Sequence, residues 1–596
     1  GEHFENLIQL IDRLIVEKQY DGITVLLQES RSKNHLKEVC AEAVQICVIN
    51  LTEENYRNNF ELYMCCEELL KTIAHNATEE EILLELLEII ETTKADITFT
   101  TALKALQICL LRLKKNRSRA LEWSLNSIRS YISELNVPKY LETGYDEKQE
   151  KLLEQEAGVH SVLTNYITIF LFYAPLRTEL EAVKSKDTFY DTSITRKNVL
   201  ICFILQLLDK PLSLLDLTRK EGTTNYHSFQ CARALARDLS ALLVDPFFLL
   251  SYVELRVRWK PKHPEDGVYE LASRDIFLVD EKAPLVALGV YYYLLFVEDL
   301  ILEKAPKIYR NMYFFESCLY LVVVLLETEE PPHQYKGILL GLKILENLGK
   351  ELIVSDVLDL NVHSNFCNAL IKIVVYSNSE RNRRLGLQLL KKYILQFEDD
   401  GRFFLLKNII QITDHDGLRG YVITMYKDFV AERLKAGKTP LPENFSAKEL
   451  RNIMLNHICV LKNGFETDIM QASQQIISSL NVIRYFSIAD TENRTSFWDF
   501  LKDLENDFLS PLRKGLIISR AHYKEEENRV RRNLDASGEL NPSCSISLLS
   551  GEDLPNISKE DKLNMLSSAM ITFDLIESLC ARINECIDAN KRNKSK

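Results

Sequence analysis

Two similar phrases, LGLKILENL at residues 340–348 and LGLQLLKKY at residues 385–393, begin 45 residues apart. A break and a second apolar segment follow each phrase, SNFCNALIKIVV in one case and FFLLKNIIQIT in the other. Apolar residues recur at three- and four-residue spacing throughout, as in amphipathic helices. Helix pairs that repeat about every 40–47 residues are typical of HEAT and armadillo repeats. The sequence therefore predicts an α-solenoid, with a compact, irregular all-helical protein as the alternative.

Composition supports helices. Of 596 residues, 46% are hydrophobic and 27% are charged, which suffices for a large buried core. The 19 glycines and 15 prolines are about half the usual share, and because both residues interrupt helices, their scarcity favours long ones. Strand-like alternation is nearly missing, and CSISLL at residues 544–549 is the best strand candidate. The expected fold class is all-α, a HEAT/armadillo-like helical repeat.

The proline-rich segment RWKPKHPEDG at residues 258–267 is the best candidate for a boundary. It predicts an N-terminal helical repeat region at residues 1–260 and a C-terminal HEAT-like region at residues 268–596. Weaker breaks are expected at residues 136–147, 435–444 and 535–543.

Charge and cysteine content limit the classes of function. A net charge of −13 argues against general nucleic-acid binding, which needs a basic surface. The 13 cysteines include no CxxC pair and lie mostly in apolar helical runs, as do reduced, buried thiols of intracellular proteins. The N-terminus does not resemble a signal peptide. The long uncharged run at residues 157–176 contains His160, Asn165 and several hydroxyl side chains, so we expect a buried helix and no membrane insertion. The expected location is the cytoplasm, with the nucleus as a second compartment.

No common catalytic motif is present: P-loop, GxGxxG, GxSxG, HExxH and kinase patterns are all missing. The trio Asp414, His415 and Asp416 precedes Gly417 and indicates a turn and helix cap. His363 and Cys367 share a helix face, but without a second pair nearby they indicate a buried histidine and thiol. We therefore expect no enzyme activity, no catalytic or metal site and no cofactor.

The segment FLSPLRKGLIISRAHYKEEE, residues 508–527, predicts a helix that starts with Ser510 as a cap and Pro511 in the first turn. Successive residues of a helix lie about 100° apart. This spacing puts four residues on a face toward the core: Leu512, Leu516, Tyr523 and Val530. A basic stripe lies beside them: Arg513, Arg520, Lys524 and Arg531. The stripe is either a solvated face or, with Tyr523 at its edge, a protein-docking surface, and the pattern does not choose between them.

Four phrases in this region resemble the glomulin family: SLNVIRYFSIADTEN (479–493), FLSPLRKGLIISRAHY (508–523), SGEDLPN (550–556) and ITFDLIESLCARI (571–583). The resemblance implies a HEAT-like helical protein that binds the RING-box subunit of cullin-RING ubiquitin ligases. Such a protein covers the RING surface on which the ubiquitin-conjugating enzyme docks, and it inhibits ubiquitin transfer without catalysis. We expect a monomer apart from this partner. The alternative is a general helical-repeat scaffold or trafficking adaptor with a different protein partner.

The resemblance further implies that residues of about 421–596 carry the partner-binding face. Its expected members are Lys427, Asn481, Arg484, Arg520 and Tyr523. The alternatives are capping or bracing a helix for Asn481, pairing with Asp490 or Glu492 for Arg484, and a core position for Tyr523. Ile517 and Ile518 stand where the family would have polar or thioether side chains.

The last helix is expected to start at a capping box formed by Ser558 and Asp561. An apolar seam at three- and four-residue spacing should pack it on the preceding helices and close the solenoid. The seam comprises Ala569, Phe573, Ile576, Cys580, Ile583 and Ile587.

Overall fold

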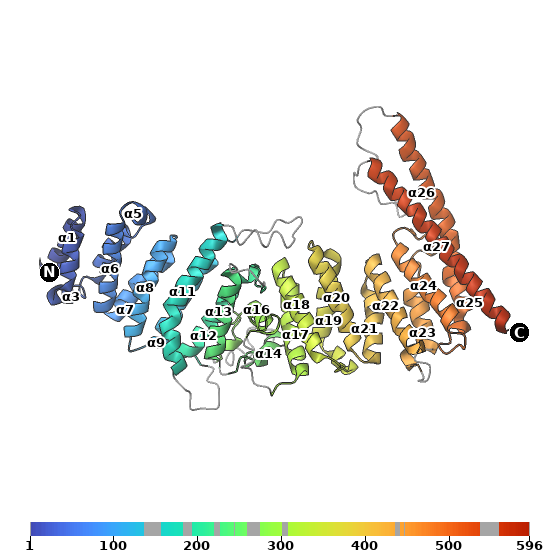
Figure 1. The fold of residues 1–596 in the computed structure, drawn as a ribbon, viewed down its shortest axis with the longest axis horizontal. Helices are drawn as coiled ribbons and strands as arrows, with labels where there is room; N and C mark the ends of the chain where they lie inside the picture. Colours follow the sequence, from blue (N-terminus) through green and yellow to red (C-terminus); the bar gives the residue numbers. More distant parts are fainter. Residues whose placement is uncertain are drawn as a thin grey trace, which may run out of the picture. The chain divides into compact units, whose positions relative to one another are not determined.

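The computed structural model describes residues 2–135, 137, 157–182, 193–219, 227–243, 245–258, 275–300, 308–435, 441–445, 447–536 and 559–594. In these ranges the chain is helical and holds no strand, and one isolated β-bridge joins Ile353 to Phe397. The expected all-α fold class is confirmed (Figure 1). The strand candidate at residues 544–549 lies outside the described residues.

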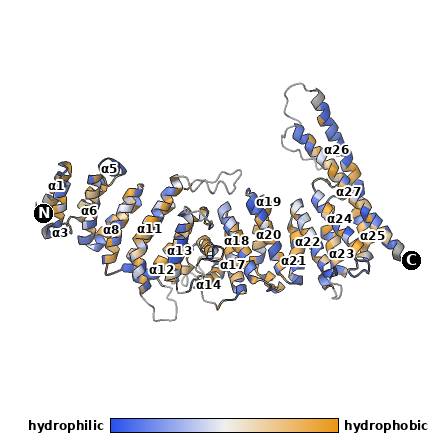
Figure 2. Cartoon of the chain, viewed as in Figure 1, coloured by the Kyte–Doolittle hydropathy of each residue, from blue (hydrophilic) through white to orange (hydrophobic). Residues whose placement is uncertain are grey.

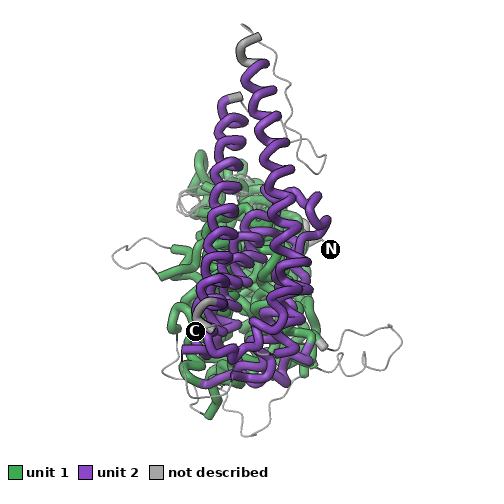
Figure 3. The backbone as a smooth tube through the Cα atoms, turned by 90° about the vertical axis from the view of Figure 1, so that its right-hand side faces the viewer, with its two compact units in different colours: residues 1–350, 361–390 green, residues 351–360, 391–596 purple. Residues whose placement is uncertain are grey.

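Contacts divide the chain into two compact units, residues 1–350 with 361–390 and residues 351–360 with 391–596 (Figure 3). This division lies well after the expected boundary at residues 258–267, of which 259–267 fall outside the described residues. The helices of the first unit are α1 (Glu2–Val16), α2 (Tyr20–Gln28), α3 (Ser30–His35), α4 (Cys40–Asn50), α5 (Glu53–Asn58), α6 (Phe60–Asn76), α7 (Glu79–Thr92), α8 (Asp96–Arg112), α9 (Arg117–Ser133), α11 (Ala157–Ala182), α12 (Arg196–Leu207), α13 (His227–Leu242), α14 (Leu250–Arg258), α16 (Leu285–Phe296), α17 (Asn311–Glu327), α18 (Pro331–Leu348), α19 (Asn361–Tyr376) and most of α20 (Glu380–Gln396).

Helices of the first unit form two layers. In one layer α4 packs on α7, α7 on α9 and α9 on α12, while in the other α6 packs on α8, α8 on α11 and α11 on α13. Hydrophobic and hydrophilic residues share most of these helices, as amphipathic packing requires (Figure 2). Each helix thus buries its apolar side against the next helix in its own layer and against the other layer.

The repeated phrases occupy equivalent helices. The first lies in α18 and the second in α20, and each is followed by a further helix, α19 and α21 (Asp399–Ile412). Gly341 of the first phrase permits close packing here, because an added Cβ would lie 3.0 Å from Leu389 Cδ2 of the second. The repeating helix pair expected from the sequence is confirmed.

The apolar helix α11 is, among the described helices, the one long and apolar enough to cross a membrane. Half of its most apolar stretch of 18 residues is buried. It packs against α8 and α13, and its Tyr166 Oη donates a hydrogen bond of 2.6 Å to the carbonyl of Leu207. The helix therefore has the packing that was expected for a buried segment.

The cysteines of the described residues form no disulfide bonds with one another. Ten of these twelve thiols are buried, and Cys65 and Cys586 are half-buried. Burial raises the pKa of the Cys40 and Cys66 thiols to about 12. The cysteines are therefore apolar core residues, as their sequence surroundings indicated.

The second unit contains α21, α22 (Asp416–Lys435), α23 (Ala447–Ile453), α24 (Ser473–Ala489), α25 (Leu501–Leu504), α26 (Ser510–Ala536), α27 (Lys559–Lys594), the π-helical turns Met454–Ile458 and Glu505–Leu509, and the 3-10 turns Ser355–Asp359, Glu443–Phe445, Gly464–Glu466 and Phe497–Phe500. All six residues of the predicted seam on α27 are buried. The seam is thus confirmed, and α27 packs against both α24 and α26. Ser558 of the expected capping box lies outside the described residues.

The expected cap at Ser510 is wrong. Ser510 has helical backbone angles (φ −68°, ψ −46°) and follows the π-helical turn Glu505–Leu509 directly. The chain is therefore helical from Leu501 to Ala536, with Pro511 inside it. Proline lacks an N–H and its ring crowds the carbonyl four residues earlier, so the wider π-helical turn accommodates it.

Asp96 joins three helices of the first unit. Its carboxylate, at the start of α8, accepts hydrogen bonds from Tyr131 Oη of α9 (2.6 Å) and from Ser161 Oγ and Asn165 Nδ2 of α11 (2.6 and 3.0 Å). Burial alone would raise the pKa of Asp96, but the three donated hydrogen bonds outweigh it and lower this pKa below its usual value.

We expect Asp96→Asn to lower the free energy of unfolding by about 1.5–3 kcal/mol at neutral pH, the usual range for hydrogen bonds to a charged group. A lowered pKa in the folded state stabilises the fold above the unfolded pKa of about 3.9, and this contribution is lost as the pH falls below it. Urea unfolding followed by circular dichroism should therefore show that the wild type and Asp96→Asn differ in free energy of unfolding, and that this difference becomes smaller as the pH is lowered. Asp12→Asn, at an exposed position of α1, is the control. If this difference in free energy of unfolding were the same at all pH values, the ionised carboxylate of Asp96 would not be the source of the stabilisation.

Candidate protein-docking face

The expected docking residues lie on three helices of the second unit: α22, α24 and α26. Helix α22 packs on α24, α24 on α27 and α27 on α26. Helices α26 and α27 are antiparallel, since Arg513 contacts Asn584 while Tyr523 contacts Phe573. The two helices lie side by side and extend beyond α22 and α24 (Figures 1 and 3).

Tyr523 is a core residue with 1% of its surface exposed. Its ring packs edge to face on Phe573 of α27, with 5.5 Å between the ring centroids. Its hydroxyl lies 3.2 Å from both carboxylate oxygens of Asp468, which precedes α24. Burial, followed by the negative charge and hydrogen bond of Asp468, raises the pKa of Tyr523. The core alternative therefore holds, and a direct contact between this ring and a partner is contradicted by its burial.

Arg520 binds two carboxylates of α27. Its Nη1 donates a hydrogen bond of 2.6 Å to Asp574, and its Nη2 donates one of 2.7 Å to Glu577. About a third of the side chain stays exposed, and both acidic partners are more exposed than the arginine. The local net charge of the three groups is −1, so this part of the surface is not basic.

The basic stripe of α26 has a function that neither sequence interpretation included. Arg513 Nη2 donates a hydrogen bond of 3.0 Å to Asn584 of α27, and Arg531 pairs with Glu527 of its own helix at 2.7 Å. Arg513 and Arg520 therefore contact α27, while the acids that pair with the stripe lie on α27 for Arg520, on α26 for Arg531 and before α26, at Glu505, for Arg513. Lys524 and Arg531 remain exposed, so the stripe is solvated only in part, and the chain returns as α27 along the part that holds Arg513 and Arg520.

Lys427 and Asn481 lie at the same level of two parallel helices. Thr424 Oγ1 of α22 is 3.4 Å from Ser478 Oγ of α24, and the next residues in the same register, three positions on, are Lys427 and Asn481. Lys427 Nζ is 3.1 Å from the carboxylate of its neighbour Asp428. Both side chains are half-buried, so each retains surface that a partner could contact.

Arg484 lies almost one turn after Asn481 on α24 and is also half-buried. Its Nε is buried and has no hydrogen-bond partner among the described residues. The carboxylate of Asp490, one of its expected partners, instead accepts hydrogen bonds from the backbone N–H groups of Arg494 (2.7 Å) and Thr495 (3.0 Å). Asp490 therefore holds the turn after α24.

The structure places Lys427 on α22 and both Asn481 and Arg484 on α24, which packs against α22. Arg520 is separate from them, because α27 packs on α24 on one side and on α26 on the other. The five predicted residues therefore do not form one continuous face.

Sequence reasoning missed the exposed aliphatic residues of α27. Ile571 is 67% exposed and Leu575, one turn later, is 48% exposed. On α26, Ile517 and Ile518 are exposed as well. The sequence could have predicted this exposure, because Ile571 and Leu575 are apolar residues that do not belong to the apolar seam of α27. Exposed aliphatic side chains beside charged ones are typical of protein-binding surfaces.

Asp416, His363 and Cys367 have structural roles in this fold. No group of three or more His, Cys, Asp and Glu side chains among the described residues could hold a metal ion. Asp416 accepts hydrogen bonds from the backbone N–H groups of Gln474 and Gln475 (2.8 and 2.9 Å), so it caps α24. His363 and Cys367 are buried, and burial lowers the pKa of His363 to about 4.

Comparisons with known proteins point to one family. A family model described as "Uncharacterised protein family, YAP/Alf4/glomulin" matches residues 280–569. Glomulin of Mus musculus is 25% identical over 603 residues, covering 99% of this chain and 94% of that protein. Glomulin of Homo sapiens is 26% identical over 600 residues, covering 98% of this chain and 93% of that protein.

Among solved structures, the karyopherin Kap121p is similar at 12% sequence identity. A crystal structure of Kap121p has a TM-score of 0.20, with 96% of this chain and 61% of that chain covered. Kap121p bound to the extreme C-terminus of the protein phosphatase Cdc14p has a TM-score of 0.21, with 94% and 57% covered. This chain thus spans about three fifths of the karyopherin's length.

We expect Tyr523→Phe to destabilise the protein by about 1–2 kcal/mol, because it keeps the packing on Phe573 but leaves Asp468 without the hydroxyl donor. Tyr523→Ala also removes the buried ring and should lower the free energy of unfolding by about 3–5 kcal/mol. Hydrogen exchange of α26 and α27 measures both effects. Lys524→Ala, at the exposed neighbouring position, should leave exchange unchanged. Equal effects of the Phe and Ala variants would contradict the packing role of the ring.

Proposed function

Because this chain belongs to the YAP/Alf4/glomulin family, we propose that it is a non-catalytic inhibitor of cullin-RING ubiquitin ligases. In this proposal it binds the RING domain of the RING-box subunit and masks the surface on which the ubiquitin-conjugating enzyme docks. The observation that carries the proposal is the similarity to glomulins over nearly the full length of the chain. The family match also includes α22, α24 and α26, on which four of the five expected docking residues are at least partly exposed.

The proposed binding face consists of Lys427, Asn481 and Arg484 on α22 and α24, Ile571 and Leu575 on α27, and Arg520 with its two acidic partners. Stable protein interfaces bury about 1,200–2,000 Å² in total, and an apolar centre with a polar rim is usual. Ile571 and Leu575 supply exposed apolar surface, and the charged side chains beside them supply polar contacts.

Masking requires a face that keeps its shape. The Arg520 contacts to Asp574 and Glu577 and the contact of Tyr523 with Asp468 hold α26 against α27 and against the segment before α24. A face that is already ordered loses little conformational entropy when it binds. The proposed inhibition is competition for one RING surface, so no bond is formed or broken by the inhibitor.

The test is a titration of the protein into a purified RING-box–cullin complex, with discharge of ubiquitin from a charged conjugating enzyme as the readout. Saturable inhibition that weakens as the conjugating enzyme is raised would support competition. We expect the double variant Ile571→Asp with Leu575→Asp to need at least about tenfold more protein for half-inhibition, since it removes the exposed apolar surface. Ile412→Asp, at an exposed isoleucine of α21, is the matched control.

Arg520 needs a different variant, because Arg520→Glu alone would also repel Asp574 and Glu577. In the exchange Arg520→Glu with Glu577→Arg, an opposite-charge pair between α26 and α27 is kept. We expect this protein to fold normally and to inhibit less well than the wild type if Arg520 contacts the RING domain. Undiminished ubiquitin discharge at micromolar excess of wild-type protein would refute the proposed function and favour a helical scaffold with another partner.

A further inference from the structure

A groove lies between α7 and α9 of the first unit, far along the sequence from the proposed RING-binding face. Its volume is about 460 Å³, and both polar and apolar side chains line it. Leu84 of α7 is 61% exposed and Trp123 of α9 is 49% exposed. The lining residues are Leu84, Leu87, Glu88, Glu91, Trp123, Asn126, Ser127 and Ser130. A half-exposed tryptophan in a groove is the type of side chain that often dominates a binding interface.

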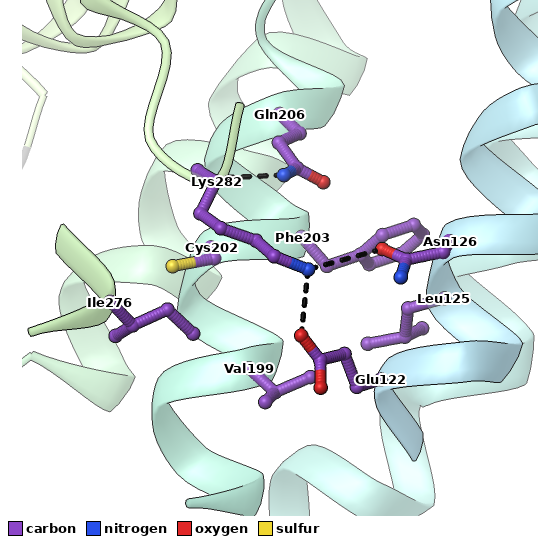
Figure 4. Close-up of a pocket in the computed structure, with 9 residues that line it drawn as sticks. All are labelled: Glu122, Leu125, Asn126, Val199, Cys202, Phe203, Gln206, Ile276 and Lys282. Atoms are coloured by element: carbon purple, nitrogen blue, oxygen red, sulfur yellow. Dashed lines mark hydrogen bonds and ion pairs between the residues drawn. The ribbon is translucent and has the colours of Figure 1, made fainter. Parts of the chain in front are cut away.

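The next groove in the same layer, between α9 and α12, is already filled by the chain itself. Ile276 and Lys282 of the segment 275–283 line it, and Ile276 is buried there. Lys282 Nζ reaches back to Glu122 of α9, with 2.7 Å to the carboxylate and 3.5 Å to Asn126 Oδ1 (Figure 4). The space that remains there is about 10 Å³, about enough for one water molecule.

The filled groove also holds the backbone of its occupant. Gln206 Nε2 of α12 donates hydrogen bonds to the carbonyls of Glu281 (2.8 Å) and Lys282 (3.0 Å). The segment is thus held in three ways: apolar side chains are buried, a lysine pairs with an acid on α9, and an amide side chain binds main-chain carbonyls. Asn126 lines both grooves, so the filled and the open groove are direct neighbours.

The open groove has an acidic side. Glu88 and Glu91 of α7 line it, and both are exposed. Glu91 accepts a hydrogen bond of 2.6 Å from Ser127 Oγ across the groove. Arg119, one turn before Trp123, is an exposed basic residue on the α9 side.

We propose that the groove between α7 and α9 binds a short segment of a partner protein that carries a bulky apolar residue and a lysine or arginine close to it in sequence. The apolar residue would pack between Leu84 and Trp123, as Ile276 packs in the next groove. The basic residue would pair with Glu88 or Glu91, as Lys282 pairs with Glu122. This site lies outside the proposed RING-binding face and gives the first unit a second protein-binding function.

The probes for the test are fluorescein-labelled ten-residue peptides with an Ile-Phe pair and one lysine, otherwise serine and glycine. The lysine is placed two to seven residues after the phenylalanine, a range that includes the spacing of Phe277 and Lys282. Each peptide has a twin with glutamate in place of lysine. We expect at least one lysine peptide to bind the full-length protein saturably, with a change in fluorescence anisotropy, and its glutamate twin to bind at least tenfold more weakly.

Substitutions in the groove between α7 and α9 test whether the peptide binds there. Glu88→Lys and Trp123→Ala should each lower the affinity for the lysine peptide at least tenfold. Glu88→Lys should also reduce the difference in affinity between the lysine peptide and its glutamate twin. The controls are Glu61→Lys and Leu171→Ala, exposed positions on α6 and α11 in the other layer. Both the groove variants and the controls should still inhibit ubiquitin discharge like the wild type, which separates this test from that of the proposed function.

Three results would overturn the inference. The first is that no lysine peptide binds saturably up to millimolar concentration. The second is that binding occurs but is equally strong in Glu88→Lys and Trp123→Ala. The third is that wild-type protein self-associates in sedimentation experiments and that these two variants abolish it, since the groove would then be covered by a second copy of the chain.

Discussion

The helices of this protein bury more of their circumference than a single neighbour can cover. In α12, every residue from Asn198 to Leu207 is buried, and in α16 every residue from Ala287 to Phe296 is buried. Such helices need neighbours in their own layer and in the opposite layer, so each helix pair depends on the next one in the stack. The packing of α4, α7, α9 and α12 on one side and of α6, α8, α11 and α13 on the other satisfies this requirement. The grooves and faces available for partners are what remains on the outer side of these layers.

Much of the fold could be predicted because helical periodicity is local. The core face of α26 and the seam of α27 follow from the spacing of apolar residues within one helix, and the buried residues match them. The repeat of 45 residues between the two leucine-rich phrases likewise identified equivalent helices, α18 and α20. None of these inferences requires knowledge of which helix packs on which.

The candidate site was less predictable because its contacts join residues distant in sequence. Arg520 pairs with Asp574 and Glu577, and Tyr523 contacts Asp468, at separations of 54 to 57 residues. The path by which the chain returns as α27 decides whether the flank of α26 is solvated, and the sequence of α26 contains no information on that path. Asp416 is a similar case, since the turn was expected but the helix that it caps begins 57 residues later, at Ser473. The π-helical turn before Pro511 was missed because serine followed by proline is more often a helix start.

The burial of the thiols has a practical consequence. A thiol reacts as its thiolate, and the raised pKa values of Cys40, Cys66 and Cys109 leave very little thiolate at neutral pH. Reaction with an alkylating reagent therefore requires the surrounding helices to open first. Buried cysteines are spread from α4 to α27, with Cys459 and Cys580 in the second unit. The wild-type chain thus carries a set of native reporters, and its pattern of alkylation by mass spectrometry would rank the helix pairs by the free energy of their local opening.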